Sequence, residues 1–152
     1  MNYRHLRSIA KIVSLLAVVA CMAAFMKKKE KVKGLKDYYK SYFPIGAAVT
    51  PQSLHGPDSL LIVQQFNSLT AENVMKMGPI HPEENKFIWE PADAIVNFAQ
   101  AHGMKMRGHT LCWHNQAPRW MFKDSAGNNV SKELLLQRLK NHITERSGRA
   151  HV

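Results

Sequence analysis

Three short segments of strand length, the first of them an apolar run, alternate with three segments that have helical spacing. Parallel strands need a long connection between them, and that connection is usually a helix. The order strand, helix, strand, helix, strand, helix therefore predicts right-handed βαβ units and an α/β fold with a parallel sheet. The expected strands are residues 45–49, 67–71 and 105–108, and the expected helices are 58–66, 92–102 and 131–144.

Local signals refine this expectation. The run 45–49 has no polar alternation, which predicts a strand buried on both faces. Gly103 is a suitable stop for the second helix, and Ser131 is a suitable N-cap for the third. Segment 79–91 is rich in Pro, Asn and Glu, so we expect a loop there.

Residues 1–26 have the pattern of an export leader. Arg4, Arg7 and Lys11 precede an uncharged run of 15 residues, which is shorter than the roughly 20 residues of a spanning helix. An uncleaved membrane anchor is the alternative. Residues 18–21 (VVAC) resemble the lipobox of bacterial lipoproteins, so lipidation of Cys21 and ordinary cleavage both stay open. Either way we expect export, to the periplasm, the cell surface or the medium of a bacterium.

The positive charge is concentrated near the amino terminus. Of the net +10, residues 1–36 contribute +8, from nine basic residues and one acidic residue. The other 12 basic and 10 acidic residues nearly cancel, which argues against nucleic acid as a partner of the body. We therefore divide the chain into a leader (1–26), a basic tether (27–36) and a body (37–152). Beside Cys21 the only cysteine is Cys112, expected to be a small packed residue, so no disulfide framework is available.

Polar and aromatic side chains follow the second and third expected strands. Parallel strands end on one side of a sheet, so we expect the two groups on one face. An indole can lie against the flat face of a sugar, while carboxylate, amide, imidazole and ammonium groups pair with its hydroxyls. The candidate binding residues are Glu72, Asn73, Lys76, His109, Trp113, His114 and Gln116.

Simpler interpretations of these residues stay open. Glu72 and Lys76 have the spacing of a helical ion pair, Trp113 alone is more typical of a core, and His109 alone of a structural histidine. The segment HTLCWH lacks the usual zinc-binding spacings, so we expect no metal, and nothing in the sequence indicates a cofactor.

Two segments resemble motifs of glycoside hydrolase family 10, the endo-1,4-β-xylanases. Residues 69–76 (LTAENVMK) are similar to the family's T-x-E-N-x-M-K, and residues 107–116 (RGHTLCWHNQ) to its R-G-H-T-L-x-W-H-x-Q. Residues 43–48 resemble the family's first strand, and Pro118-Arg119-Trp120 its P-x-W. The resemblance covers roughly residues 35–145.

The resemblance implies a TIM (β/α)8 barrel, of which this chain would supply about the first three βα units. It also implies roles for the binding residues. Glu72, Asn73 and Lys76 would bind xylose hydroxyls on the non-reducing side of the cleavage point. His109 and Gln116 would line the sugar site nearest the scissile bond, Trp113 would shape that site, and His114 would support it. The partner would be xylan or a xylo-oligosaccharide, with a membrane contacted only through the leader or a lipid.

Catalysis in this family is retaining and uses two Glu residues, whose carboxyl groups lie about 5–5.5 Å apart. One belongs to a W-D-V-x-N-E motif and the other to a T-E-x-D motif, and neither motif occurs in these 152 residues. Residues 145–152 are polar, aperiodic and unlike the family, which favours a truncated reading frame. We therefore expect an endo-1,4-β-xylanase sequence that is inactive as it stands. A non-catalytic xylan-binding remnant or non-functional fragment is the first alternative, and an unrelated basic membrane or nucleic-acid protein is the second.

Overall fold

A computed structural model describes residues 32–149 of the chain. The chain divides into two units, Met1–Val32 and Lys33–Val152, and nearly all described residues belong to the second. The leader, its lipobox-like segment and Cys21 lie outside the described residues, as do residues 27–31 of the tether. Within 32–149, no helix combines the length and apolar character needed to cross a lipid bilayer.

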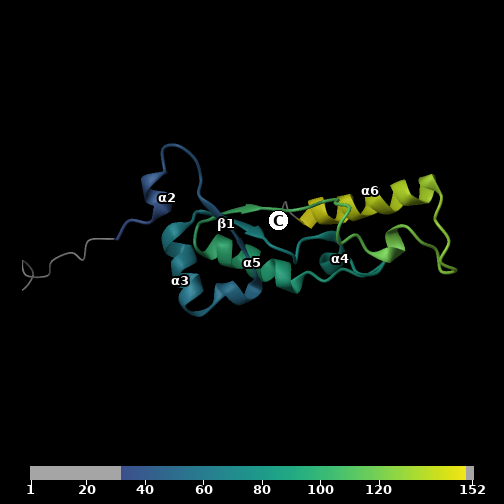
Figure 1. Ribbon diagram of the computed structural model, residues 1–152, viewed down its shortest axis with the longest axis horizontal. Coiled ribbons are helices and arrows are strands. Elements are labelled where there is room, and N and C mark those ends of the chain that lie inside the picture. Colours follow the sequence, from purple (N-terminus) through teal and green to yellow (C-terminus); the bar gives the residue numbers. More distant parts are fainter. Residues whose placement is uncertain (1–31, 150–152) are drawn as a thin grey trace, which may run out of the picture. The chain divides into compact units, whose positions relative to one another are not determined.

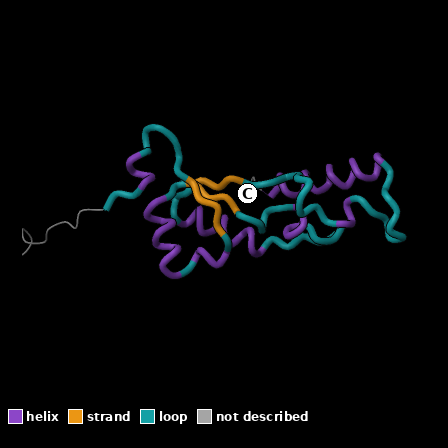
Figure 2. The backbone as a smooth tube through the Cα atoms, in the orientation of Figure 1, coloured by secondary structure: helices purple, strands orange, loops and turns teal. Residues whose placement is uncertain are grey.

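The central feature is a parallel sheet of three strands in the order β1-β2-β3 (Figure 2). β1 is Gly46–Val49, β2 is Ser68–Ala71 and β3 is Lys105–Arg107. Ala48 pairs with Thr70, which in turn pairs with Arg107, so the three strands are in register and end at one edge. The predicted parallel α/β arrangement is confirmed.

The two faces of this sheet differ in polarity. Ala47, Leu69 and Met106 are register partners, and Leu69 is fully buried at the centre of the core cluster. The neighbouring row alternates to the opposite face and contains Ala48, which is exposed. The prediction that 45–49 is buried on both faces is therefore wrong. β1 is an edge strand, and only Val49 of its four residues is buried.

Two helices cover the apolar face. α3 (Gly56–Gln65) begins with Pro57 in its first turn, and α5 (Glu90–Ala101) packs against β2 and β3 (Figure 1). Gly103 adopts a φ of 62° just beyond α5 and ends it, as predicted. The 3₁₀ helix η1 (Pro51–Leu54) contacts both helices. The hydrophobic core combines inward side chains of these helices with residues of β1, β2, α4 and the adjoining segments: Val49, Leu54, Ile62, Leu69, Ala71, Met75, Ile80, Ala92, Ile95, Ala99 and Met104.

Two predicted boundaries need correction. The expected loop 79–91 is partly helical, because α4 (Met77–Ile80) includes its start and α5 begins at Glu90. α6 begins at Lys132 after Ser131, whose Oγ accepts a hydrogen bond from the Leu134 amide at 3.3 Å, so the predicted N-cap is confirmed. The helix does not end near Thr144 but continues to Arg149. The residues beyond Thr144 carry a polar inward face, which an apolar periodicity does not detect. A second 3₁₀ helix, η2 (Arg119–Met121), precedes α6.

A short helix that spans the predicted boundary between tether and body packs against α3. α2 (Leu35–Tyr38) follows Gly34, which is buried. A Cβ atom on Gly34 would lie 1.9 Å from the backbone oxygen of Gln64 in α3. The Lys36 ammonium also donates to the Val63 carbonyl at 2.5 Å. The backbone of α2 can therefore approach α3 this closely only where residue 34 has no side chain.

We expect Gly34→Ala to lower the free energy of unfolding by about 1–3 kcal/mol, because a backbone oxygen cannot move as a flexible side chain can. Gly148→Ala is the matched control, since a Cβ atom there meets open space within a helix. Urea unfolding of both variants measures the difference. Equal stabilities would contradict the close approach of α2 to α3.

Candidate functional site

The segment after β2 places three of the predicted binding residues. The Glu72 amide donates to the Val49 carbonyl at 3.0 Å, which continues the strand pairing by one residue. Residues 72–76 then form bends and turns instead of a helix, and the Lys76 ammonium donates to Asn73 Oδ1 at 2.8 Å. The interpretation of Glu72 and Lys76 as a helical ion pair is therefore wrong.

The segment after β3 places the aromatic group. The rings of His109 and Trp113 lie 6.3 Å apart between centroids, and the ring of His114 meets Trp113 edge-on at 5.4 Å. The Trp113 side chain is 37% exposed, so it is not a core residue. Cys112 is also exposed, which corrects the prediction of a packed thiol.

Side-chain contacts join these two segments directly. Gln116 Nε2 donates to Asn73 Oδ1 at 3.3 Å, and the Lys76 ammonium lies 5.0 Å from the centre of the Trp113 ring. Asn73 Oδ1 therefore accepts from residues of both loops, and a cation–π contact lies beside it. The expectation that both groups gather on one face is confirmed for these four residues.

A backbone contact fixes the distance between the same segments. The Gly78 amide donates to the Gln116 carbonyl at 2.6 Å, and Gln116 adopts a φ of 59°. A Cβ atom on Gly78 would lie 2.7 Å from that carbonyl oxygen. Glycine at 78 thus allows the loop after β3 to contact the start of α4.

Among residues 32–149, no three His, Cys, Asp or Glu side chains form a group that could hold a metal ion. This includes His109, Cys112 and His114, which are close in sequence.

The sequence analysis missed a buried histidine pair beside the site. His81 Nδ1 and His142 Nδ1 lie 3.0 Å apart, and His81 Nε2 lies 2.9 Å from the Glu84 carbonyl oxygen. Both rings are buried, and Phe87 stacks on His81 with 3.8 Å between centroids. Position 142 lies between the apolar residues Leu139 and Ile143 on α6, and that placement was the available signal.

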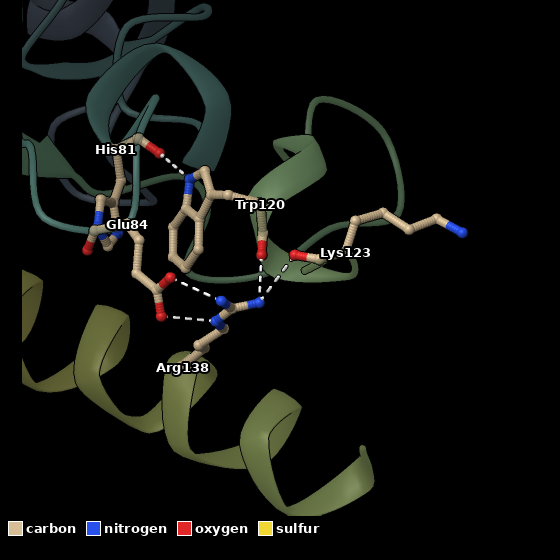
Figure 3. A network of polar contacts seen from close by, with 5 residues as sticks. All are labelled: His81, Glu84, Trp120, Lys123 and Arg138. Atoms are coloured by element: carbon tan, nitrogen blue, oxygen red, sulfur yellow. Dashed lines mark hydrogen bonds and ion pairs between the residues drawn. The ribbon is translucent and has the colours of Figure 1, made fainter. Parts of the chain in front are cut away.

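A hydrogen-bond network centred on Arg138 lies beside His81 (Figure 3). The guanidinium grips the Glu84 carboxylate with two bonds of 2.6 Å. It also donates to the carbonyls of Trp120 and Lys123, at 2.5 and 3.2 Å. Trp120 Nε1 in turn donates to the His81 carbonyl at 3.0 Å. Bidentate pairing of this kind is geometrically specific, so α6, η2 and the segment after α4 are held together.

Burial and charge both act on the histidines. Desolvation, followed by the charges of His81 and Arg146, lowers the pKa of His142 to about 4. Desolvation also lowers the pKa of His81, although the neighbouring Glu84 opposes this. The pair is therefore neutral in the folded protein near pH 7.

We expect stability to fall as the pH falls from about 6.5 towards 4. The unfolded chain binds a proton on His142 at its ordinary pKa of 6.5, whereas the folded chain does not until about pH 4. The stabilisation that neutral His142 contributes is complete above pH 6.5. At about 1.4 kcal/mol per pKa unit, the shift from 6.5 to about 4 corresponds to a loss of roughly 3 kcal/mol at low pH. Urea unfolding at several pH values measures it. His142→Gln should flatten the profile, and His55→Gln, at an exposed histidine, should not. Identical profiles in both variants would contradict the assignment to His142.

Parallel βα units with ligand groups at the carboxyl edge of the strands are the arrangement of (β/α)8-barrel enzymes. Residues 34–151 match the model of Glycosyl hydrolase family 10, and the chain belongs to that family. The family implies a TIM barrel, of which the described residues contain a three-stranded parallel part.

Relatives agree with this membership. An endo-1,4-beta-xylanase/feruloyl esterase of Xylanibacter ruminicola is 51% identical over 111 residues, covering 72% of this chain and 15% of the relative. The crystal structure of an endo-1,4-beta-xylanase from Caldicellulosiruptor owensensis superimposes with a TM-score of 0.74 at 49% identity, over 78% of this chain and 36% of that one. A mutant structure in complex with xylotriose has a TM-score of 0.69 at 46% identity, over 72% of this chain and 33% of that one. The chain thus spans little more than a third of these proteins or less.

Proposed function

We propose that the chain is a sugar-binding part of a retaining endo-1,4-β-xylanase, a hydrolase of the β-1,4 bonds of xylan. Glu72, Asn73 and Lys76 would hold xylose hydroxyls on the non-reducing side of the cleavage point. His109, Trp113, His114 and Gln116 would line or support the sugar site next to that point. Family membership, the xylanase relatives and the relative bound to xylotriose support this assignment.

The observation that carries the proposal is the junction between the two loops. Asn73 Oδ1 joins Lys76 and Gln116, and Lys76 lies against Trp113. Ammonium and amide donors beside a partly exposed indole are the groups that a pyranose needs, since its rim carries hydroxyls and its faces are weakly apolar. Both lone pairs of Asn73 Oδ1 are used by the bonds from Lys76 and Gln116. The Asn73 amide nitrogen, the Gln116 amide oxygen and the remaining donors of the Lys76 ammonium leave capacity for sugar hydroxyls.

We expect the 152-residue chain to bind xylotriose, and Lys76→Met to weaken that binding at least about tenfold, because a charge-assisted hydrogen bond is worth about 1.5–3 kcal/mol. Trp113→Ala should weaken it at least as much by removing the apolar platform. Isothermal titration calorimetry provides the dissociation constants.

Lys140→Met is the matched control, because Lys140 is exposed on α6 and has no role in the proposed site. Maltotriose serves as a control ligand with the same number of rings and a different linkage. Undiminished xylotriose binding by both site variants would contradict the proposed contacts.

Hydrolysis needs two carboxyl groups whose motifs do not occur in these residues. We therefore expect the 152-residue chain by itself to release no more reducing sugar from xylan than a blank, measured beside a complete family 10 enzyme. Clear turnover would show that acid/base and nucleophilic groups are present within these residues. Binding without turnover is also what the alternative of a xylan-binding remnant predicts.

Export belongs to the same proposal. Xylan is an extracellular polymer for the cells that degrade it, and residues 1–26 have the charge and apolar pattern of an export leader. Lipidation of Cys21 would tether the body at a membrane surface.

A further inference from the structure

α6 carries a buried polar stripe on one side. Arg138, His142 and Arg146 are four residues apart, so they share one face of the helix. His142 and Arg146 are 0% and 8% exposed, and the Arg138 side chain is 10% exposed. A helix face in this position is ordinarily apolar.

The first two members of the stripe bind the segment that follows α4 and residues within and just after η2. Arg138 binds the Glu84 carboxylate and the carbonyls of Trp120 and Lys123 (Figure 3). His142 pairs with His81 immediately after α4. Since Lys76 is the N-cap of α4, these contacts fix the helix that begins at one of the proposed sugar contacts.

The third member reaches the loop after β3. One NH group of Arg146 donates to the Thr110 carbonyl, and its other terminal nitrogen lies 3.8 Å from the point where a Cβ atom on Gly108 would be. Thr110 follows His109 directly and precedes Trp113 and Gln116 in the same loop. The guanidinium therefore lies beneath the loop that carries the aromatic half of the proposed site.

This placement is energetically costly. Desolvation lowers the pKa of Arg146, and among residues 32–149 no carboxylate lies within ion-pair distance of it. A buried charge loses most of its hydrogen bonds to water, and a backbone carbonyl replaces only a few of them. An apolar side chain would fill the same space without the desolvation cost of a guanidinium. The feature that only the arginine provides is therefore its hydrogen bond to the Thr110 carbonyl.

On the basis of the proposed function, we infer that Arg146 is a positioning residue for sugar binding. It holds the Thr110 carbonyl and thereby fixes the loop that presents His109, Trp113 and Gln116. Arg138 and His142 fix the facing segment, so α6 supports both halves of the site, in addition to the direct Gly78–Gln116 contact, without contacting the sugar.

The test compares Arg146→Met, which removes the donors, with Arg146→Lys, which keeps a donor and the charge. We expect Arg146→Met to weaken xylotriose binding by the full chain about tenfold, because the loop must then be ordered by the sugar itself. Arg146→Lys should recover a large part of this affinity. Hydrogen exchange should rise in residues 109–116 of Arg146→Met and stay unchanged in β1 and β2.

Two controls separate positioning from general stability. Ile95→Val removes a methyl group from the core on α5 and should lower the thermal midpoint without changing affinity or exchange in 109–116. Lys140→Met, on an exposed part of α6, should change none of these quantities. An affinity of Arg146→Met equal to wild type, or one that falls no further than in Ile95→Val, would overturn the inference.

Failure of the proposed function gives a different result. If the wild-type chain does not bind xylotriose, the sugar assignment fails, and hydrogen exchange alone decides the role of Arg146. Faster exchange confined to 109–116 in Arg146→Met, absent from both controls, would still support positioning of the loop. Unchanged exchange there would overturn it.

Discussion

The parallel register of the three strands is the constraint on which the site depends. Ala48, Thr70 and Arg107 form one row across the sheet, so β2 and β3 end side by side. The loops that follow must emerge at the same edge, whatever their sequences. Asn73 and Gln116, 43 residues apart, can then share a hydrogen bond. A shift of one residue in either strand would turn its side chains to the opposite face and separate the loops.

The register of the strands determines where the loops begin, but it does not determine the positions of the residues further along each loop. Each loop leaves the sheet with several exposed residues, and each is then tied down by contacts with parts of the chain that lie outside the sheet. The Gly78 amide holds the Gln116 carbonyl, and the Trp120 indole holds the His81 carbonyl. Loops supported by hydrogen-bonded partners keep a more constant geometry than loops that only cross solvent, which is what a binding site needs.

The sequence predicted the parts of the fold that depend on apolar periodicity and on turn chemistry. The three strands, the helices α3 and α5, the stop at Gly103 and the cap at Ser131 lie where their patterns indicated them. The apolar run 45–49 was misleading, because small residues such as Ala48 are compatible with burial and with an exposed edge. Alternation of polar residues with Leu69 and Met106 in the neighbouring strands was the better indicator of a sheet with one apolar face.

The site was predictable only in part, and the nature of its contacts explains why. Its proposed binding residues belong to two motifs, so they could be put forward from the sequence, whereas the residues that support their loops could not. Arg138, Arg146 and the Trp120 indole donate mainly to backbone carbonyls, those of Trp120, Lys123, Thr110 and His81. Every residue has a carbonyl, so the acceptors leave no mark in the sequence. The buried polar side chains of α6 do leave a mark, because Arg138, His142 and Arg146 are spaced by four on a helix whose inward face should be apolar. Such a stripe shows that a helix buries something other than hydrocarbon, but only coordinates show which loop it holds.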